Sequence, residues 1–350
     1  MAKRIGILTG GGDCPGLNAV IRSLVRRAIK NHGLECVGIS HGWRGLLDGL
    51  SRPLDIDSVS GILTRGGTIL RTSRTNPFIH EGGPRQIMDN VKRMGLSGLI
   101  VVGGYDALVV AHRMHAEHGL NVVGIPKTID NDVPGTDYSF GFDSTVNIAM
   151  EAIDRIHTTA ESHDRVMIIE VMGHLTGWIA TCAGLASGAD AILIPEKPIG
   201  IHQIGEAILR RHDRGKDFSI VVVAEGARLT DGEQDDAPVV AQDSHEDEFG
   251  HVRLGGIGIA LAKEIENRTG FQTRVTVLGH LLRGGPPSAF DRILGTRYGV
   301  AAVDLVMNDD FGKMVAMEGG RIVAIPLEVM MQERKSVPEE LFGVAETFFG

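Results

Sequence analysis

The chain has 350 residues, of which 43% are hydrophobic and 23% are charged, so its composition is that of a globular protein large enough for two domains. Its net charge of −9 argues against nucleic acid or an anionic membrane as a partner. The three cysteines lack disulfide or metal-ligand spacing, and no stretch approaches the roughly 18 apolar residues of a membrane-spanning helix, so we expect a soluble, cytoplasmic protein.

Short β-branched runs alternate with longer helical patterns along almost the whole chain. The predicted strands cover residues 4–8, 35–39, 98–102, 122–125, 166–171, 191–194, 219–224, 274–278 and 321–325. The predicted helices cover residues 17–30, 85–94, 108–118, 144–161, 204–211, 257–268 and 290–307. Several strands are apolar on both faces, as parallel strands covered by helices must be. We therefore predict an α/β fold with mainly parallel sheets, and the number of strands favours two of them.

Three glycine turns are candidates for binding phosphate. Gly11 and Gly12 follow the first predicted strand, Gly104 follows the strand at 98–102, and the pair at 66–67 leads to Arg74. Glycine allows backbone amides to approach an anion, and a following helix adds its positive N-terminus. The spacing matches neither the Walker pattern nor the GxGxxG dinucleotide fingerprint, and for each turn a plain tight turn remains the alternative.

The segment Pro-Lys-Thr-Ile-Asp-Asn-Asp at 126–132 carries the strongest chemical signal. It follows a predicted strand, and open α/β sheets place their ligands at the carboxyl ends of strands. If the backbone stays extended, Asp130 and Asp132 face the same side and point into one cleft. One carboxylate could then accept a proton while the other orients water or a metal, and Lys127 could neutralise a phosphate. A polar turn with a capping aspartate is the alternative.

Arginine and histidine residues also gather near predicted strand ends, at Arg165, His174, Arg274, His280 and Arg283. A guanidinium group matches the geometry of a phosphate, so this pattern indicates a multiply charged anion. The acidic stretch at 231–248 is expected to be a solvated loop or hairpin tip, because a charge run more often hydrates a surface than binds a metal.

Taken together, these motifs resemble those of the 6-phosphofructokinase family, from about residue 3 to about residue 325. The matching segments are TGGGDCPGLNAVIR at 9–22, GGT…SRTNP at 66–77, PKTIDND at 126–132, SHDR at 162–165, VMG at 171–173, AEGA at 224–227 and LGHLLRGG at 278–285. The resemblance implies two Rossmann-like three-layer domains with the active site in the cleft between them. Residues 1–141 plus about 282–330 would form the larger donor-binding domain. Residues 142–281, with part of the C-terminal segment, would form the smaller sugar-phosphate-binding domain.

The resemblance also implies an activity and a set of roles. Such enzymes use Mg²⁺ to transfer a phosphoryl group to the 1-hydroxyl of fructose 6-phosphate, as homodimers or homotetramers whose sites are shared between subunits. Asp130 would be the general base, with Thr128 and Asp132 at the transferring phosphate. Donor contacts would come from Gly11, Gly12, Arg74 and Gly104. Sugar-phosphate contacts would come from Met172, Gly173, His174, Glu225, His280 and Arg283, and from Arg165 and Arg274 of a second subunit.

Two positions bear on the phosphoryl donor. Family members that use ATP usually carry glycine at the positions of Asp106 and Lys127, whereas users of pyrophosphate carry aspartate and lysine, as this chain does. A carboxylate at residue 106 would repel the α-phosphate of a nucleotide or occupy its space, and the Lys127 ammonium would neutralise a bare pyrophosphate. Leu108 and Val110 also stand where smaller residues usually admit a nucleotide. We therefore predict pyrophosphate as the donor, with ATP as the alternative.

Two departures from the family pattern concern catalysis. Tyr105 stands where the family has a carboxylate that helps to hold Mg²⁺, and a phenol is a poor ligand for that ion. His174 stands where the family has the arginine of its Met-Gly-Arg motif. The residues that would hold a metal are therefore unknown. The chain is interpreted as a pyrophosphate-dependent phosphofructokinase of reduced activity, acting on fructose 6-phosphate or a related sugar phosphate such as sedoheptulose 7-phosphate. A non-catalytic, regulatory sugar-phosphate-binding paralogue is the alternative.

Overall fold

The computed structural model describes residues 3–230 and 241–349. The chain divides into two compact units. Unit 1 comprises Met1–Ser144, Asp247–His251 and Arg283–Arg334, and unit 2 comprises Thr145–Glu246, Val252–Leu282 and Lys335–Gly350. Among the described residues, no helix is both long enough and apolar enough to cross a bilayer.

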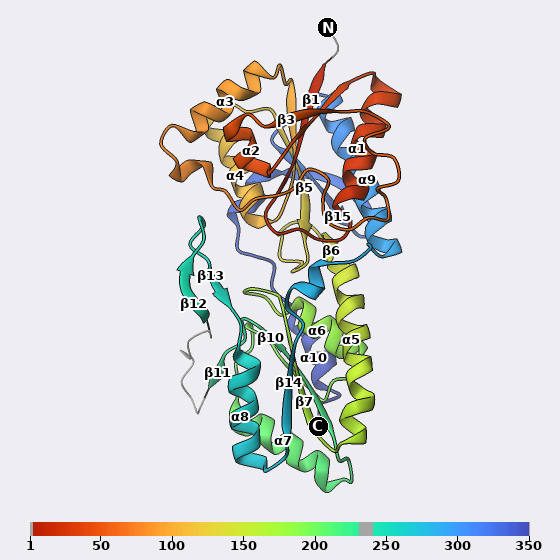
Figure 1. The fold of residues 1–350 in the computed structure, drawn as a ribbon, viewed down its shortest axis with the longest axis vertical. Coiled ribbons are helices and arrows are strands. Elements are labelled where there is room, and N and C mark those ends of the chain that lie inside the picture. The colour runs from red at the N-terminus through yellow and green to blue at the C-terminus, as the bar shows by residue number, and fades with distance from the viewer. Residues whose placement is uncertain (1–2, 231–240, 350) are drawn as a thin grey trace. The chain divides into compact units, whose positions relative to one another are not determined.

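Unit 1 is built on an eight-stranded sheet (Figure 1), whose order is β16-β15-β5-β4-β1-β2-β3, with β6 beside β5. The strands are β1 (Arg4–Gly10), β2 (Glu35–Ile39), β3 (Ser51–Leu54), β4 (Gly98–Gly103), β5 (Val122–Thr128), β6 (Phe140–Gly141), β15 (Lys313–Glu318) and β16 (Arg321–Pro326). The central strands are parallel, and only the pairs β2–β3 and β15–β16 at the two edges are antiparallel. The central strands are buried along their whole length, which explains their continuous apolar sequences.

Helices cover both faces of this sheet (Figure 1), with α1 and α9 on one face and α2, α3 and α4 on the other. Their bounds are α1 (Leu17–His32), α2 (Gly42–Asp48), α3 (Gly83–Arg93), α4 (Tyr105–His118) and α9 (Ala289–Met307), with short 3-10 turns η1 (Pro77–Ile79) and η3 (Leu327–Met331). Helices α1 and α9 approach closely because α9 carries glycine at the contact. A Cβ atom on Gly299 would lie only 2.0 Å from Ser23 Oγ.

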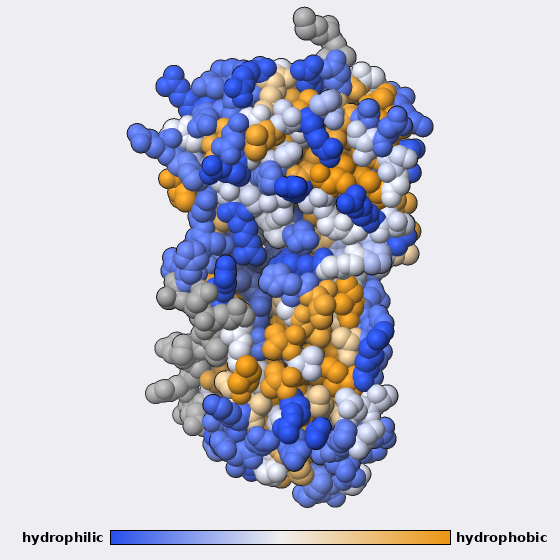
Figure 2. Space-filling view, in the orientation of Figure 1, coloured by the Kyte–Doolittle hydropathy of each residue, from blue (hydrophilic) through white to orange (hydrophobic). Residues whose placement is uncertain are grey.

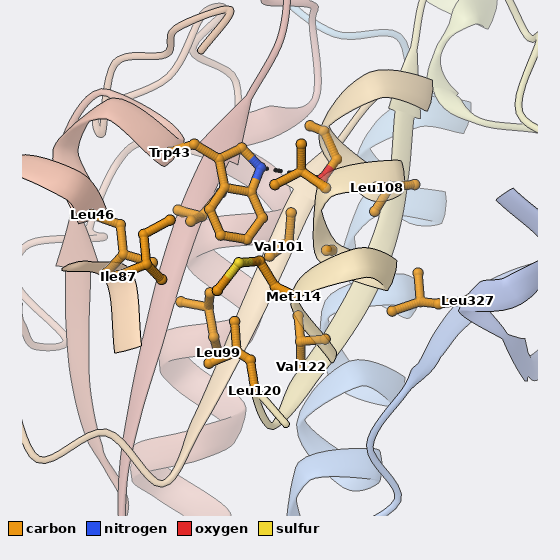
Figure 3. Close-up of a cluster of buried hydrophobic side chains, with 14 of the residues drawn as sticks. Trp43, Leu46, Ile87, Leu99, Val101, Leu108, Met114, Leu120, Val122 and Leu327 are labelled. Carbon is orange, nitrogen blue, oxygen red and sulfur yellow. Dashed lines mark hydrogen bonds between the residues drawn. The ribbon is translucent and has the colours of Figure 1, made fainter. Parts of the chain in front are cut away.

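A buried apolar cluster fixes α2, α3 and α4 on their face of the sheet (Figure 3). Trp43 of α2 packs here with Met114 of α4 and Leu99 of β4, and each is at most 1% exposed. The indole Nε1 of Trp43 donates a hydrogen bond of 3.2 Å to the Ala107 carbonyl, so the one polar atom of this large side chain is paired. The first turn of α4 is thereby held beside the sheet.

Unit 2 has its own parallel sheet, in the order β14-β7-β10-β8. These strands are β7 (Val166–Val171), β8 (Ala191–Leu193), β10 (Ser219–Ala224) and β14 (Thr273–Val277). The helices are α5 (Phe142–Ser162), α6 (Trp178–Ala186), α7 (Ile201–Asp213), α8 (Ile257–Thr269) and α10 (Glu339–Glu346), and η2 (Gly279–Arg283) follows β14. Helices α7 and α8 pack on one face of the sheet, and α5 and α6 lie on the other (Figure 1). Two short strands pair beside it, β9 (Ile199–Gly200) with β11 (Leu229–Thr230), and β12 (Ala241–Glu246) forms a hairpin with β13 (Val252–Leu254).

A buried glutamate joins the sheet of unit 2 to a helix. Glu170 on β7 is 2% exposed, and its carboxylate accepts hydrogen bonds of 2.9 Å from the backbone N–H groups of Gly256 and Gly258. These groups open α8 and would otherwise lack intrahelical partners. The charge of Glu170 is thus held by the positive end of the helix that covers it.

The predicted α/β class with mainly parallel sheets is confirmed. All nine predicted strands and all seven predicted helices are present, with ends that differ by a few residues. In the described part of the chain, the helices that were not predicted are α2, α6 and α10, and the strands that were not predicted are β3, β15 and the short strands β6, β9, β11, β12 and β13. The donor and sugar-phosphate roles expected of the two parts of the chain stay predictions.

Candidate functional site

The site in unit 1 lies at the carboxyl ends of three neighbouring strands. In the parallel register Gly10 of β1 is the partner of Gly103 of β4, and Gly103 is the partner of Pro126 of β5. The turn after β1, the turn after β4 and the segment after β5 therefore begin side by side, at the carboxyl ends of these central strands. Two glycine turns and the Asp130 segment, found separately in the sequence, meet where α/β sheets bind their ligands.

A lysine side chain forms a hydrogen bond with the turn after β1. Lys127, the penultimate residue of β5, is 3% exposed, and its Nζ donates a hydrogen bond to the Gly12 carbonyl. Burial lowers the pKa of this ammonium group, because a low-dielectric environment disfavours the charged form. Gly11 has a φ of 80°, a conformation that favours glycine, and its N–H donates to the Ser73 carbonyl at 2.9 Å.

Arg283 lies against the same turn. Its Nη1 donates to the Asp13 carbonyl at 3.1 Å, and a Cβ atom on Gly12 would lie 2.6 Å from that nitrogen. A side chain at residue 12 would therefore displace the end of the Arg283 side chain from its present position. Arg283 was predicted as a sugar-phosphate contact, and the structure groups it in unit 1 beside the predicted donor glycines.

The expectation of extended backbone between Asp130 and Asp132 is wrong. Asn131 is left-handed, with a φ of 49°, and asparagine is one of the few residues that tolerate this conformation. Its side chain is fixed on both sides, because Oδ1 accepts from the Ser139 N–H at 3.0 Å and Nδ2 donates to the Asp137 carbonyl at 3.3 Å. The two carboxylates nevertheless lie close enough to interact.

Asp130 has the properties of a proton acceptor. Its pKa is raised, first by burial and then by the negative charge of Asp132. The backbone N–H of Asp130 donates to Thr128 Oγ1 at 3.0 Å, and that hydroxyl lies 3.4 Å from Asp130 Oδ2. A carboxylate with a raised pKa is a stronger base, and Thr128 holds it in one orientation.

The structure adds an arginine that the sequence did not reveal. Arg334 forms an ion pair with Asp132, and its Nη2 lies 3.2 Å from Asp106 Oδ1. The guanidinium carbon also lies 4.1 Å from the centre of the Tyr105 ring, and the Tyr105 hydroxyl donates to the Gln332 carbonyl at 3.0 Å. Arg334 stands outside every matching motif, so no spacing in the sequence pointed to it.

A hairpin tip contacts the same residues. Asp247–His251, between β12 and β13, groups with unit 1. His251 Nε2 lies 3.1 Å from the Asp106 carboxylate, which raises the pKa of the histidine, and Asp247 lies 3.4 Å from Arg74. The acidic stretch at 231–248 was interpreted as a solvated loop or hairpin tip. A hairpin is present, although residues 231–240 lie outside the described part, and its tip is in contact with Arg74 and Asp106.

In unit 2 the predicted residues form two groups. Met172, Gly173 and His174 make the turn after β7, where Glu225 Oε1 accepts from the N–H groups of Gly173 at 3.3 Å and His174 at 3.0 Å. Glu225 follows β10, whose last residue pairs with the last residue of β7. Glu225 therefore shapes this turn. His280 is exposed in η2, which follows the carboxyl end of β14.

Arg165 and Arg274 lie at the opposite end of the same sheet. Arg165 precedes β7 and its Nε donates to Gln272 Oε1 at 3.2 Å, while Arg274 is the second residue of β14. The six residues of β7 separate Arg165 from Met172, a span of about 20 Å. One copy of unit 2 therefore does not bring the two groups together.

Comparison with known proteins gives the family. The family model described as phosphofructokinase matches residues 4–306. The chain belongs to the phosphofructokinase family. A pyrophosphate–fructose 6-phosphate 1-phosphotransferase of Streptomyces coelicolor is 53% identical over 347 residues, with 99% of this chain and all of the relative covered. The ATP-dependent 6-phosphofructokinase 2 of the same organism is 48% identical over 346 residues, with the same coverage.

A solved structure agrees. The phosphofructokinase from Saccharomyces cerevisiae is 31% identical and superimposes with a TM-score of 0.80 over 99% of this chain. The present chain spans about half the length of that one, 46%. The resemblance stated from the motifs is therefore confirmed. Relatives named for either donor are similar to this phosphofructokinase at comparable identity, so the donor has to be argued from the site.

Two residues that were expected to restrict the donor lie in the core instead. Leu108 and Val110 are 0% and 2% exposed and belong to the buried cluster under α4 (Figure 3). Both side chains are buried among apolar neighbours, and Leu108 packs beside Gly124 of β5, so their bulk lies in the core. The interpretation that they crowd a nucleotide is wrong, and Asp106 and Lys127 stay as the residues predicted to discriminate between donors.

The residues present do not fit a protein-held Mg²⁺. Among the described residues, no group of three His, Cys, Asp or Glu side chains is placed to hold a metal ion. Arg334 already bridges Asp106 and Asp132, and the Tyr105 hydroxyl is engaged with Gln332. Mg²⁺ dependence therefore stays a prediction from the resemblance, and no residue of this chain is assigned to that ion.

Proposed function

We propose that this phosphofructokinase transfers a phosphoryl group from pyrophosphate to the 1-hydroxyl of fructose 6-phosphate. The observation that carries the proposal is the end of β5, where a buried ammonium group and, three residues on, a carboxylate with a raised pKa stand beside the two glycine turns. The name of the Streptomyces coelicolor relative at 53% identity supports the same reaction.

Pyrophosphate would bind at the glycine turns. The amides of Gly12 and Gly104 would donate to phosphate oxygens, and the first turn of α4 adds a positive helix end. The N–H of Gly11 already donates to the Ser73 carbonyl, so Gly11 would contribute through the shape of its turn. Lys127, below the Gly12 carbonyl, and the half-exposed Arg74 would share the negative charge of the donor. Asp106 stands beside Gly104, where its side chain, held by Arg334 and His251, would occupy the space of the additional phosphate of a nucleotide. This arrangement favours pyrophosphate over ATP.

In the chemical step, Asp130 would take the proton of the 1-hydroxyl as that oxygen attacks the nearer phosphorus. The new O–P bond forms while the bridging O–P bond of pyrophosphate breaks, and the products are fructose 1,6-bisphosphate and orthophosphate. The leaving phosphate keeps the electron pair of the broken bond, and Lys127 and Arg74 stabilise its charge. Thr128 would hold the base in line.

The acceptor would be bound through unit 2. Met172, Gly173, His174, Glu225 and His280 would contact the sugar phosphate, and Arg283, which groups in unit 1, stays a predicted contact of the same ligand. Arg165 and Arg274 would act in the site of a second copy, because they stand at the other end of the sheet of unit 2. Apolar side chains gather on the face of this unit over β14 and α5 (Figure 2), where Val277 is 48% exposed, and a second copy would cover such a surface.

We propose a homodimer or homotetramer that works in the cytoplasm, with Mg²⁺ supplied together with pyrophosphate. The test is a donor-and-acceptor matrix: purified protein with Mg²⁺, pyrophosphate or ATP, and fructose 6-phosphate or sedoheptulose 7-phosphate. Pyrophosphate should give bisphosphate at least about tenfold faster than ATP. The proposal is lost if neither sugar yields bisphosphate above a control without enzyme, and a faster reaction with ATP would establish the alternative donor.

A second candidate is a non-catalytic, sugar-phosphate-binding regulatory paralogue. It is favoured by Tyr105, whose hydroxyl and ring are both engaged within the protein, and by His174 in place of an arginine. It requires binding of fructose 6-phosphate without turnover. The double substitution Tyr105→Asp with His174→Arg should then create activity, and a double variant as inactive as the parent protein would count against this reading of the two residues.

A further inference from the structure

Two carboxylates stand in the region where the proposed donor binds. Asp106 opens α4 beside Gly104, and Asp132 follows the Asp130 segment after β5. Asp132 is 4% exposed, so water screens its charge poorly. Two unneutralised negative charges at this place would repel a pyrophosphate. A cation is therefore required between them, and no metal-ligating group is present there in the described residues.

Arg334 supplies that cation. One arm of its guanidinium pairs with Asp132 and the other lies 3.2 Å from Asp106 Oδ1, so a single planar group bridges both carboxylates. The Arg334 side chain is 19% exposed, which makes the two ion pairs stronger than surface ones. The next residue, Lys335, groups with unit 2, so Arg334 is the last residue of unit 1.

Tyr105 fixes Arg334 in this position. Its ring lies beneath the guanidinium at 4.1 Å, a distance at which a cation is attracted to the ring face. Its hydroxyl donates to the carbonyl of Gln332, two residues before the arginine. Tyr105 thus holds both the side chain of Arg334 and the backbone that leads to it. A carboxylate at position 105 would instead add a third negative charge to the cluster.

We propose that Arg334 is a resident cation that takes the place of a protein-held divalent ion between Asp106 and Asp132. Arg334 is a positioning residue, because it acts on the donor through these two carboxylates by neutralising and orienting them. Tyr105 and Arg334 act together in this replacement. The tyrosine ring stands where the family has a carboxylate, and the arginine stands for the metal ion that this carboxylate would help to hold. The part of the inference that concerns pyrophosphate rests on the proposed function. The part that concerns divalent ions does not.

Binding of Mn²⁺ to the protein in the absence of substrates tests whether Arg334 takes the place of a divalent ion. Free and bound Mn²⁺ are distinguished by electron paramagnetic resonance, without pyrophosphate or sugar, for the wild-type chain, Arg334→Gln and Arg334→Lys. We expect Arg334→Gln to gain one Mn²⁺ per chain relative to the other two, and to lose it again when Asp106→Asn is added. A wild-type chain that binds Mn²⁺ and releases it on Asp132→Asn overturns the inference, as does a folded Arg334→Gln chain without the additional ion.

Binding of pyrophosphate, measured by calorimetry without Mg²⁺, is the second readout. Arg334→Gln should weaken it about tenfold or more, and Arg334→Lys should keep most of the affinity because it keeps the charge. Arg113→Gln is the matched control, since Arg113 also stacks on a ring, that of Phe78, and pairs with a carboxylate, that of Glu117. Equal affinity in Arg334→Gln and Arg113→Gln contradicts the role of the charge. Neither measurement needs turnover, so an inactive protein defeats the proposed function and leaves this inference open to its own test.

Discussion

Lys127 Nζ donates a hydrogen bond to the carbonyl oxygen of Gly12, so the side chain of β5 supports the turn that follows β1. The ammonium group is buried, and burial lowers its pKa. In the proposed function, this lysine balances part of the charge of a phosphate bound at the turn.

Lys127→Met keeps most of the aliphatic length and removes the charge. We expect the KM for pyrophosphate to rise about tenfold to hundredfold, since a hydrogen bond to a charged group contributes about 1.5–3 kcal/mol. The KM for fructose 6-phosphate should change far less. Initial rates with each substrate varied in turn give both values, with Lys92→Met on the exposed side of α3 as control. A larger rise for the sugar than for pyrophosphate would assign Lys127 to the acceptor.

Asp130→Asn removes the proposed base without changing the size of the side chain. General-base catalysis contributes about 10²–10⁴ in rate, so kcat should fall by that factor while binding of fructose 6-phosphate stays near the wild-type value. Assays of bisphosphate formation over time measure kcat, and calorimetry measures the binding of fructose 6-phosphate. Asp89→Asn, an exposed carboxylate on α3, should leave both unchanged. Activity of Asp130→Asn within about tenfold of wild type would exclude Asp130 as the base.

The acid side of the pH–rate profile reports on the same group. Burial, followed by the charge of Asp132, raises the pKa of Asp130, and the base works only when deprotonated. Activity should therefore disappear, as pH falls, at a higher pH than an ordinary aspartate would give. Asp132→Asn removes the like charge and should move this limb to lower pH, whatever it does to the maximal rate. A limb that stays in place, or moves to higher pH, contradicts the coupling of the two carboxylates.

Long apolar runs are the reason that most of the fold could be predicted. The nine predicted strands are short β-branched stretches buried by helices, and burial on both faces leaves a readable pattern. The missed helices lack such a pattern. Helix α6 is apolar nearly all round and has no polar face to give a period, and α2 is a short segment of seven residues that lies between glycines.

The sequence predicted only those residues of the candidate site that belong to a recognisable motif directly after a predicted strand. Gly11, Gly104 and Asp130 each follow a predicted strand, and parallel register brings those ends together. Arg334 and His251 reach the same place from 202 and 145 residues away along the chain, to Asp132 and Asp106 respectively. Contacts between residues so far apart in the sequence leave no short-range pattern from which they could be predicted. The backbone of Asn131 was missed because its left-handed conformation depends on hydrogen bonds to residues further along the chain.

His251 should make the stability of unit 1 depend on pH. Its hydrogen bond to Asp106 raises its pKa, so the folded state favours the protonated ring. The stabilisation is complete below the ordinary histidine value of about 6.5 and is lost as pH rises through the raised value. His251→Gln should therefore lower the Tm more at pH 6 than at pH 9, as scanning calorimetry would detect. His163→Gln, at an exposed position, is the control, and a Tm difference that is the same at both pH values would contradict the ion pair.

Glu170 should contribute to the stability of unit 2 through α8. Glu170→Ala removes the acceptor of the part-buried Gly256 N–H and the buried Gly258 N–H, so we expect the free energy of unfolding to fall by about 2–4 kcal/mol. Glu170→Gln keeps one acceptor oxygen and should lose less. Urea denaturation followed by circular dichroism measures both, and Glu151→Ala, from an exposed pair with Arg155, should stay within about 0.5 kcal/mol. Equal losses for Glu170→Ala and Glu151→Ala would show that the cap is dispensable.

The distance along the chain from Asp132 to Arg334 also affects how the protein is made. Asp132 is synthesised 202 residues before the arginine that pairs with it, and Asp106 is synthesised 228 residues before it. A nascent chain must therefore hold these two acidic groups without that arginine until residue 334 has been added and has emerged from the ribosome. A premature stop just before codon 334 would leave this like-charge pair permanently uncompensated, even though every strand of the large sheet had already been translated.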